Sequence, residues 1–337
     1  MTFSPRVFAL AALAGSTALP ALAQEVNVYS YRQPELIEPL TDAFTEETGI
    51  KVNIVYLEKG VAERLKAEGA RSPADLALTV DITRLAALKD AGVLQAVESE
   101  ALEAAVPAEF QDPDNQWFAL TSRARIVYAS KDRVSDDEVT TYEDLASEKW
   151  RGRICTRSGL HAYNVALTAG MMEQHGEEFT REWLEGLKAN LARKPQGNDR
   201  AQVKAVSEGE CDISLGNTYY MALMLKNDEQ RQWADAVRIL FPTFEDGGTH
   251  VNVSGMGLTK AAPNKENAIQ LMEFLASEAG QKLYAEINHE FPVNPAVSIE
   301  GVMQEYTDFT PDDANLQDLA DLRSDAVKLA EEVDFDG

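Results

Sequence analysis

Hydrophobic and polar residues in the first third of the chain follow two alternating spacings. Residues 25–30 and 50–56 place apolar side chains at every second position, which predicts two strands. Residues 35–45 place them at helical spacing, and Gly49 follows, as glycine often does at a helix end. The same pattern predicts three further elements, a helix over 61–68, a strand over 74–80 and a helix over 83–91. This repeated βαβ order indicates a parallel sheet with helices on its faces.

A second set of elements occupies the middle of the chain. It comprises a strand over 150–155, helices over 165–174, 178–192 and 200–208, and a strand over 211–216. Two β-rich runs, 125–129 and 252–258, connect this set with the first, so the chain is predicted to cross twice between two lobes. We also expect an amphipathic helix over 264–286 and a helical, acidic tail over 310–329.

Residues 1–23 have the pattern of an export signal. Arg6 precedes an apolar run, and Ala21-Leu22-Ala23 fits a cleavage site, so the mature chain is expected to begin near Gln24. No other stretch approaches the roughly 20 apolar residues needed to span a bilayer. We therefore expect a protein of the bacterial periplasm that is not embedded in the membrane.

The predicted fold class is α/β with the two-lobe architecture of a type II-like periplasmic binding protein. Each lobe is expected to be a mainly parallel sheet flanked by helices, and two hinge strands join the lobes, near residues 120–128 and 249–253. The predicted boundaries assign residues 24–122 and 248–297 to the first lobe, and residues 123–247 and 298–337 to the second.

The formal net charge of the sequence is −25. So acidic a surface repels nucleic acids and anionic lipids, which argues against both as partners. Carboxylates spread over a surface are mostly solvated, so they attract cations only loosely. We expect a monomer.

Cys155 and Cys211 are the two cysteines of the chain. Disulfides persist in exported proteins, so a pair is favoured over two free thiols, subject to the geometry that a disulfide requires. The pair would tie the strand before Tyr219 to the segment before Tyr163.

Two tyrosines, Tyr219 and Tyr220, follow the predicted strand over 211–216 and precede a helix-like run. Proteins of the α/β class place ligand-binding groups at the carboxyl ends of strands. Neighbouring side chains on a regular strand point to opposite faces, so both phenols can meet one ligand only where the backbone turns. A strand-to-helix junction supplies that turn, and Tyr163 lies at a second such junction. Any one of these tyrosines could be a packed aromatic, but together they predict a site.

An export signal, two lobes and two crossings suggest a solute-binding protein that closes on its ligand. The competing class is an enzyme, such as an exported hydrolase. The sequence lacks G-x-S-x-G, H-E-x-x-H, a P-loop and a dinucleotide-binding glycine pattern, so we expect no enzyme. A binding protein for an organic solute, such as a polyamine or a small carboxylate, is a further alternative. A polyamine site needs several carboxylates, whereas these junctions carry phenols and arginines.

Several short motifs resemble one known family, and their order and spacing are more specific than any one of them. They are Val28-Tyr29-Ser30-Tyr31-Arg32, Thr79-Val80-Asp81, Trp117-Phe118, Arg123-Ala124-Arg125, Tyr163-Asn164, Gln196-Gly197-Asn198-Asp199-Arg200, Asn217-Thr218-Tyr219-Tyr220 and Asn252-Val253-Ser254-Gly255. Over nearly its whole mature length, the chain resembles the ferric-iron-binding periplasmic proteins of iron ABC importers.

The resemblance implies that Tyr163, Tyr219 and Tyr220 bind Fe(III) from the second lobe and that an inner-membrane ABC permease receives the iron. Fe(III) prefers anionic oxygen ligands, and phenolate is one. Family members that also bind a synergistic anion, often carbonate, hold it with an arginine. Arg123 is the matching position, Arg125 follows closely, and Arg32 is a further candidate, because guanidinium suits a planar oxyanion.

The loop after the first strand departs from the family pattern. Gln33-Pro34 stands where many members have a histidine or a further tyrosine, so Tyr31 is the candidate ligand from the first lobe. Asp81 stands where some relatives use a glutamate ligand, but it also suits the N-cap of the next helix. The histidines are expected to pack or to support the site rather than to bind metal: His161, His250 and His289.

Overall fold

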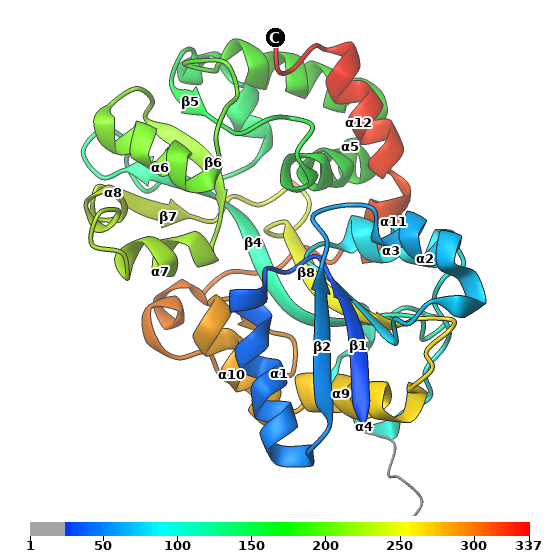
Figure 1. The fold of residues 1–337 in the computed structure, drawn as a ribbon. Coiled ribbons are helices and arrows are strands. Elements are labelled where there is room, and N and C mark those ends of the chain that lie inside the picture. The colour runs from blue at the N-terminus through cyan, green and yellow to red at the C-terminus, as the bar shows by residue number, and fades with distance from the viewer. Residues whose placement is uncertain (1–23) are drawn as a thin grey trace, which may run out of the picture.

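The structure is a computed structural model that describes residues 24–337 (Figure 1). The predicted export signal and its cleavage site lie outside the described residues. Figure 1 shows two bodies of helices and strands that meet where the strands β4 and β8 pass between them. The predicted two-lobe α/β fold is confirmed. No helix in residues 24–337 is both long enough and apolar enough to cross a membrane.

The described strands form one mixed sheet in the order β2-β1-β3-β8-β4-β6-β5, with β7 and β9 also paired to β4. Their bounds are β1 (Glu25–Ser30), β2 (Lys51–Tyr56), β3 (Leu76–Thr79), β4 (Phe118–Ser130), β5 (Ile154–Cys155), β6 (Ile213–Asn217), β7 (Val237–Leu240), β8 (Val251–Leu258) and β9 (Phe291–Pro292). The two sides of this sheet belong to the two lobes, because β4 and β8 extend across the junction between them.

Helices cover the sheet on both lobes. Those around the first three strands are α1 (Pro34–Thr48), α2 (Val61–Glu68), α3 (Ile82–Asp90), α4 (Glu100–Ala105), α9 (Lys265–Ala276) and α10 (Glu278–Asn288). Those of the other lobe are α5 (Ala162–Ala189), α6 (Asp199–Glu208), α7 (Tyr219–Leu225), α8 (Arg231–Asp235) and α12 (Arg323–Glu332). Between the lobes, α11 (Leu316–Asp321) packs against both α3 and α5. Short 3₁₀ helices span Gly69–Arg71, Ala108–Phe110, Glu143–Ala146, Glu148–Trp150 and Gly301–Tyr306.

The sheet is less parallel than the sequence pattern predicts. β1 is parallel to both β2 and β3, and β5 is parallel to β6. β4 and β8, by contrast, run antiparallel to every strand they pair with in the described chain. The chain passes from the first lobe to the second along β4 and returns along β8, so the two strands run in opposite directions. The local βαβ pattern of the sequence does not contain this information.

Several predicted helices have different bounds in the structure. The stretch over 264–286 is divided into α9 and α10 at Ser277, whose hydroxyl accepts a hydrogen bond from the Gly280 amide and so starts a new helix. The helices predicted over 165–174 and 178–192 are joined in α5, although Gly176 has a non-helical backbone with φ of 80°. The helix therefore kinks where the predicted gap lies.

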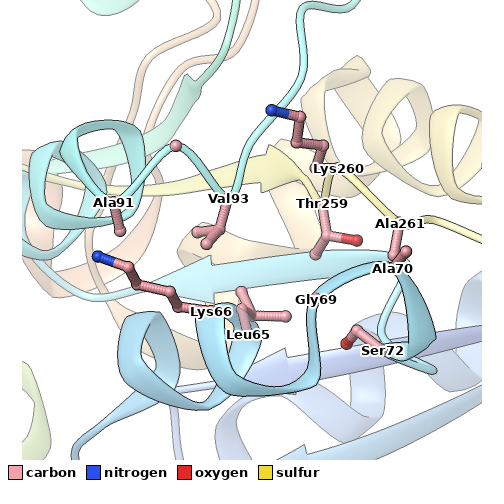
Figure 2. Close-up of a pocket in the computed structure, with 11 residues that line it drawn as sticks. Leu65, Lys66, Gly69, Ala70, Ser72, Ala91, Val93, Thr259, Lys260 and Ala261 are labelled. Atoms are coloured by element: carbon pink, nitrogen blue, oxygen red, sulfur yellow. The ribbon is translucent and has the colours of Figure 1, made fainter.

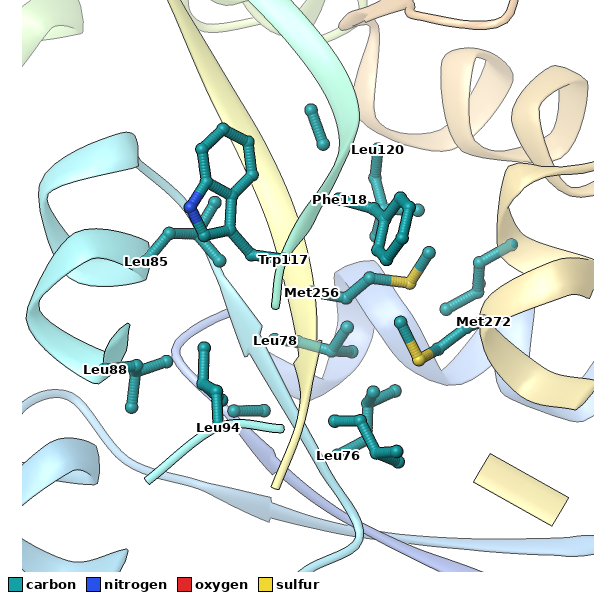
Figure 3. Packing of buried hydrophobic residues seen from close by; sticks show 14 of the residues in the cluster. Leu76, Leu78, Leu85, Leu88, Leu94, Trp117, Phe118, Leu120, Met256 and Met272 are labelled. Carbon is teal, nitrogen blue, oxygen red and sulfur yellow. The ribbon is translucent and has the colours of Figure 1, made fainter. Parts of the chain in front are cut away.

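The core of the first lobe packs leucines, methionines and aromatic residues between its strands and α3 (Figure 3). Phe118 of β4 and Met256 of β8 pair across the sheet and are fully buried. Gly255 lies so close to α3 and β4 that an added Cβ would come within 2.7 Å of the Phe118 carbonyl oxygen. This close approach fixes β8 against the rest of the lobe.

A disulfide joins Cys155 and Cys211, as predicted, with their Cα atoms 5.9 Å apart. It links the end of β5 to the turn before β6. These are the two strands whose following segments carry Tyr163 and Tyr219. In the chain-entropy model, closing a loop of this length stabilises the fold by about 4 kcal/mol.

Candidate functional site

The predicted tyrosine junctions form in the structure. β6 ends at Asn217, and Tyr219 and Tyr220 are the first two residues of α7. The Thr218 amide donates to the Ala124 carbonyl oxygen of β4, which holds the turn against the hinge strand. Tyr163 is the second residue of α5. All three phenols therefore project from the beginnings of helices that follow neighbouring parallel strands.

The three phenols meet in one place. The hydroxyl oxygens of Tyr163 and Tyr219 are 3.2 Å apart. The rings of Tyr219 and Tyr220 lie 4.3 Å apart between centroids, tilted by 38°. The structure thus gathers oxygen donors that the sequence separates by more than fifty positions.

A cavity of about 560 Å³ opens over these phenols, between the lobes. The second lobe contributes the three tyrosines together with His161 and Arg200. The first lobe contributes polar and charged side chains to the facing wall: Tyr31, Arg32, Gln33, Glu35, Tyr56, Glu58, Arg84, Asn288 and Glu290. Three clustered phenols form the base of a cleft that two lobes can close.

Burial controls the protonation of the clustered phenols. Desolvation raises the pKa of Tyr219 well above its usual value, and the adjacent phenols of Tyr163 and Tyr220 raise it further. Desolvation also raises the pKa of Tyr220, with Asp199 adding to the effect. These phenols are therefore protonated at neutral pH in the ligand-free protein, and a cation that binds them as phenolates must displace their protons.

Three guanidinium groups surround the Tyr163 ring. The Cζ atoms of Arg123, Arg125 and Arg157 lie 5.8, 5.9 and 5.3 Å from its centroid. One buried carboxylate, Asp199, is shared by two of them, with 2.6 Å between Asp199 Oδ1 and Arg125 Nη1 and a second contact to Arg157. Burial acts to raise the pKa of Asp199, but the two arginines outweigh it, so the pKa is lowered and the carboxylate stays ionised.

The two arginines predicted on β4 lie beneath the cleft rather than on its wall. Arg125 donates to Asp199, Asn217 and Asn164. Arg123 donates to the Ser254 hydroxyl at 3.1 Å and to the Val80 carbonyl oxygen. Together with Tyr163, both line a small cavity of about 10 Å³. Arg123 has no carboxylate within ion-pair distance among residues 24–337, so its charge is balanced less directly than that of Arg125.

Arg32, the third predicted arginine, does line the cleft. Its Nη2 lies 2.9 Å from Glu290 Oε1 and 2.6 Å from the Ser254 hydroxyl. Burial alone would lower the pKa of Arg32, but Glu290 more than offsets this and raises it overall. The pair links the loop after β1 to the segment before β9, which positions the first-lobe wall of the cavity.

The first-lobe candidates have structural partners. The Tyr31 hydroxyl accepts a hydrogen bond from the Val61 amide at 3.1 Å, and the Arg84 guanidinium lies 4.1 Å from the ring centroid. Asp81 is the N-cap of α3, where its side chain accepts from the Arg84 amide. The contacts of Asp81 agree with the capping role that the sequence suggested. Tyr31 lines the cleft but already uses one lone pair of its hydroxyl.

The histidines have separate roles. His161 caps α5, with Nδ1 accepting from the Tyr163 amide at 3.2 Å, and burial lowers its pKa to about 4. His250 is buried on β8, and burial lowers its pKa to about 3. His289 ends α10 with φ of 58°. Within residues 24–337, no three His, Cys, Asp or Glu side chains gather as a possible metal site.

Several site residues escaped the sequence reasoning. Arg157 and Asp199 form an ion pair across 42 positions, and Glu290 pairs with Arg32 across 258. Asp199 lay inside a motif of the resemblance, but no local pattern assigns it two arginine partners. Arg84 and Arg200 reach the cleft from the beginnings of α3 and α6. Arg200 lay in the same motif as Asp199 without an assigned role, and only the placement of a helix start could have suggested Arg84.

A second pocket, of about 450 Å³, lies on the first lobe (Figure 2). It is enclosed by the end of α2, the turn after α3 and the end of β8, with Lys66 and Lys260 among its lining residues. Its lining is mostly apolar and includes Leu65 and Val93, which are labelled in Figure 2. The described lining includes none of the predicted site residues, so this pocket is separate from the tyrosine cluster.

Comparisons with known proteins identify the family and the fold of this chain. A family model described as bacterial extracellular solute-binding protein matches residues 71–318. Iron uptake protein A1 of Synechocystis sp. is 43% identical over 93% of this chain and 88% of its own length. The crystal structure of apo ferric ion-binding protein A from Pasteurella haemolytica superposes with a TM-score of 0.90 at 50% identity, covering 94% of this chain and 99% of that one. A Trichodesmium protein solved in complex with iron and citrate ligands gives a TM-score of 0.87 at 42% identity, covering 92% and 99%.

Proposed function

We propose a function from one premise, that the chain belongs to the bacterial extracellular solute-binding protein family, among relatives named for ferric iron binding and iron uptake. The protein captures Fe(III) in the cleft between its lobes and delivers it to an inner-membrane ABC permease. The observation that carries this proposal is that Tyr163, Tyr219 and Tyr220 lie together in the lining of one cleft.

The chemistry of the cluster suits this cargo. Fe(III) is a small trivalent ion that prefers anionic oxygen, and three phenolates neutralise its charge. Neutral phenols have little affinity for a divalent ion such as Ca²⁺ or Mg²⁺, which prefers carboxylate and carbonyl oxygen. The excess of guanidinium over carboxylate around Tyr163 favours anionic oxygens at this position. Tyr31 is a further ligand candidate that would first have to give up its bond from Val61.

An oxyanion completes the site in this proposal. Three phenolates leave coordination positions open on the ion, and a small anion such as carbonate fits between iron and an arginine. Arg123 is the favoured partner because no carboxylate forms an ion pair with it among residues 24–337. Arg32 faces the same cleft, while Arg125 supports the site by fixing Asp199 and Asn164. The Trichodesmium relative solved with iron and citrate shows that an organic anion accompanies iron in one homologue.

In the proposed mechanism, the two lobes close on the bound iron. β4 and β8 are the two strands that join the lobes, with Arg123 paired to Asn252 at their crossing. A rotation about this crossing would bring the first-lobe wall onto the iron, and binding energy would favour the closed form that a permease recognises. We propose that the chain acts as a monomer in the periplasm, after removal of a signal that ends near Ala23, and that it has no catalytic activity.

The test is direct. Purified protein freed of metal is titrated with Fe(III) supplied as a weak chelate, and visible absorption and native mass are recorded. The proposal predicts one iron per chain and a coloured complex, because phenolate-to-iron charge transfer absorbs visible light. A protein that stays colourless, or binds no iron, contradicts it. A polyamine or a small carboxylate, offered under the same conditions, is expected not to change the unfolding temperature.

A further inference from the structure

The C-terminal residues touch the loop that carries the chain into α5. Asp336 Oδ1 accepts a hydrogen bond from the Gly159 amide at 2.7 Å, and its Oδ2 accepts one from the Ser158 hydroxyl. Phe335 packs directly on Gly159, where an added Cβ would come within 2.5 Å of the ring. A glycine and a carboxylate 177 positions apart thus form one contact.

The segment that bears Asp336 is itself fixed. Phe335 belongs to the buried core of the second lobe and is 3% exposed. Lys188 of α5 donates to the Val333 carbonyl oxygen at 3.0 Å, and Lys194 donates to that of Gly337 at 2.8 Å. Figure 1 shows α12 running beside α5 to reach this position. The residues on both sides of Asp336 are therefore held in place by core packing and by hydrogen bonds from two lysines.

The opposite side of the loop is held by Asn164. Its Nδ2 donates to the Arg157 and Ser158 carbonyl oxygens, at 3.0 and 3.1 Å. Its Oδ1 accepts from Arg125 at 2.6 Å. The loop thus lies between the arginine cluster of the cleft on one side and the C-terminal segment on the other.

This loop determines the surroundings of Tyr163. It carries Arg157, whose guanidinium faces the Tyr163 ring, and His161, whose Nδ1 accepts from the Tyr163 amide. The His161 ring also packs edge-on against Tyr163, 4.6 Å between centroids. Amides in the first turn of a helix have no acceptor within the helix, so the turn depends on its cap. If the loop left this position, Tyr163 would lose the N-cap from His161, the contact with the His161 ring and the contact with the Arg157 guanidinium together.

We propose that Asp336 is a positioning residue of the iron site, which clamps the loop over 157–161 and so fixes the first turn of α5 with Tyr163. The expected effect on iron binding rests on the proposed function, whereas the contacts between Asp336 and the loop do not. The clamp itself exists in the iron-free protein. A carboxylate on the last turn of the chain, outside the cleft, thereby controls how firmly one ligand is presented.

Three variants separate the clamp from general stability. Asp336→Ala removes both hydrogen bonds. Asp336→Asn keeps an acceptor for the Gly159 amide and can donate to the Ser158 hydroxyl, so it should behave as the wild type. Asp334→Asn is the matched control, because Asp334 is a highly exposed carboxylate of the same segment whose one ion pair, to Lys188, spans 3.5 Å, and asparagine tolerates its φ of 50°.

Two measurements follow. Hydrogen exchange in the iron-free protein should show the Gly159 amide protected in the wild type, Asp336→Asn and Asp334→Asn, and unprotected in Asp336→Ala. In the iron-loaded protein, release of iron to excess EDTA should be about tenfold faster for Asp336→Ala than for the other three proteins, within the range expected for the loss of its two hydrogen bonds. Unfolding temperatures of the four proteins should agree within a few degrees.

A double-variant cycle tests that the effect passes through Tyr163. In a Tyr163→Phe background, Asp336→Ala should produce no further change in iron release, because the presented ligand is already gone. An equal effect in both backgrounds would show a merely structural role and overturn the proposal, as would unchanged exchange at Gly159. If the wild type failed to bind iron, the proposed function would fall, while the exchange result would still decide the clamp.

Discussion

The phenol oxygens of Tyr163 and Tyr219 lie 3.2 Å apart although 56 positions separate the residues. At this distance two neutral phenols share a hydrogen bond, whereas two phenolates repel strongly unless a cation lies against both. The same spacing suits adjacent positions around one small ion. In the proposed site, the two phenol oxygens therefore share a hydrogen bond when no iron is bound, and both bind the metal ion when iron is present.

Replacing the junction phenols should remove the colour of the ferric protein. Tyr219→Phe combined with Tyr220→Phe deletes two of the three phenolates, so the visible charge-transfer band should disappear and iron affinity should fall by several orders of magnitude. Tyr31→Phe is the comparison, because it leaves the three second-lobe phenols in place and removes only a hydroxyl that accepts from the Val61 amide. The band should survive that change. A double variant that kept the wild-type band would place the iron elsewhere.

Iron affinity should weaken as pH falls. Burial raises the pKa of both Tyr219 and Tyr220, so these phenols are protonated in the free protein and binding must release their protons. Lower pH opposes this release, and each displaced proton weakens apparent affinity by up to about tenfold per pH unit. Competition with a chelator of known proton affinity, between pH 8 and pH 5 (roughly the range in which folded proteins are most stable), measures the slope. A flat profile would mean that phenolates do not bind the metal.

Arg123 should connect iron affinity to carbonate. Its guanidinium is buried beside the cleft without a carboxylate at ion-pair distance in the described chain. Arg123→Ala should therefore reduce affinity more in carbonate-containing buffer than in carbonate-free buffer. The comparison is made by chelator competition in both buffers, with the unfolding temperature as the check on folding. Equal losses would indicate that no anion is held by this residue.

The pair of Arg125 and Asp199 should be important for stability. Arg125→Met leaves the Asp199 carboxylate buried with Arg157 as its remaining ion-pair partner, and breaking such a pair costs about 3 kcal/mol. Urea unfolding followed by circular dichroism measures the change. Arg151→Met, in an exposed pair with Glu148, should leave the midpoint unchanged. Comparable effects of the two substitutions would show that the buried pair has no special role.

Local patterns in the sequence predicted most of the fold. Amphipathic spacing is a property of adjacent residues, which is why β1, α1 and β2 appear close to their predicted bounds. The division at Ser277 was missed because the apolar stripe continues through both helices, while the capping hydroxyl is a single residue. The antiparallel direction of β4 and β8 depends on pairing between strands more than 120 positions apart, which no local pattern records.

The candidate site was predictable in part for the same reason. Tyr163, Tyr219 and Tyr220 lie at strand-to-helix junctions, and junctions have a local signature. The partners of Arg125 and Arg32 do not, because Asp199 and Glu290 reach them through the tertiary fold. The roles of all these residues toward iron remain predictions. Their proximity to one another is a property of the structure.

The most direct test of the central claim is a crystal structure of the iron-loaded protein with the metal located by anomalous scattering at the iron absorption edge. We predict one iron in the cleft between the lobes, bonded to the phenol oxygens of Tyr163, Tyr219 and Tyr220. An iron held elsewhere, or by carboxylates without these three phenols, would contradict the account.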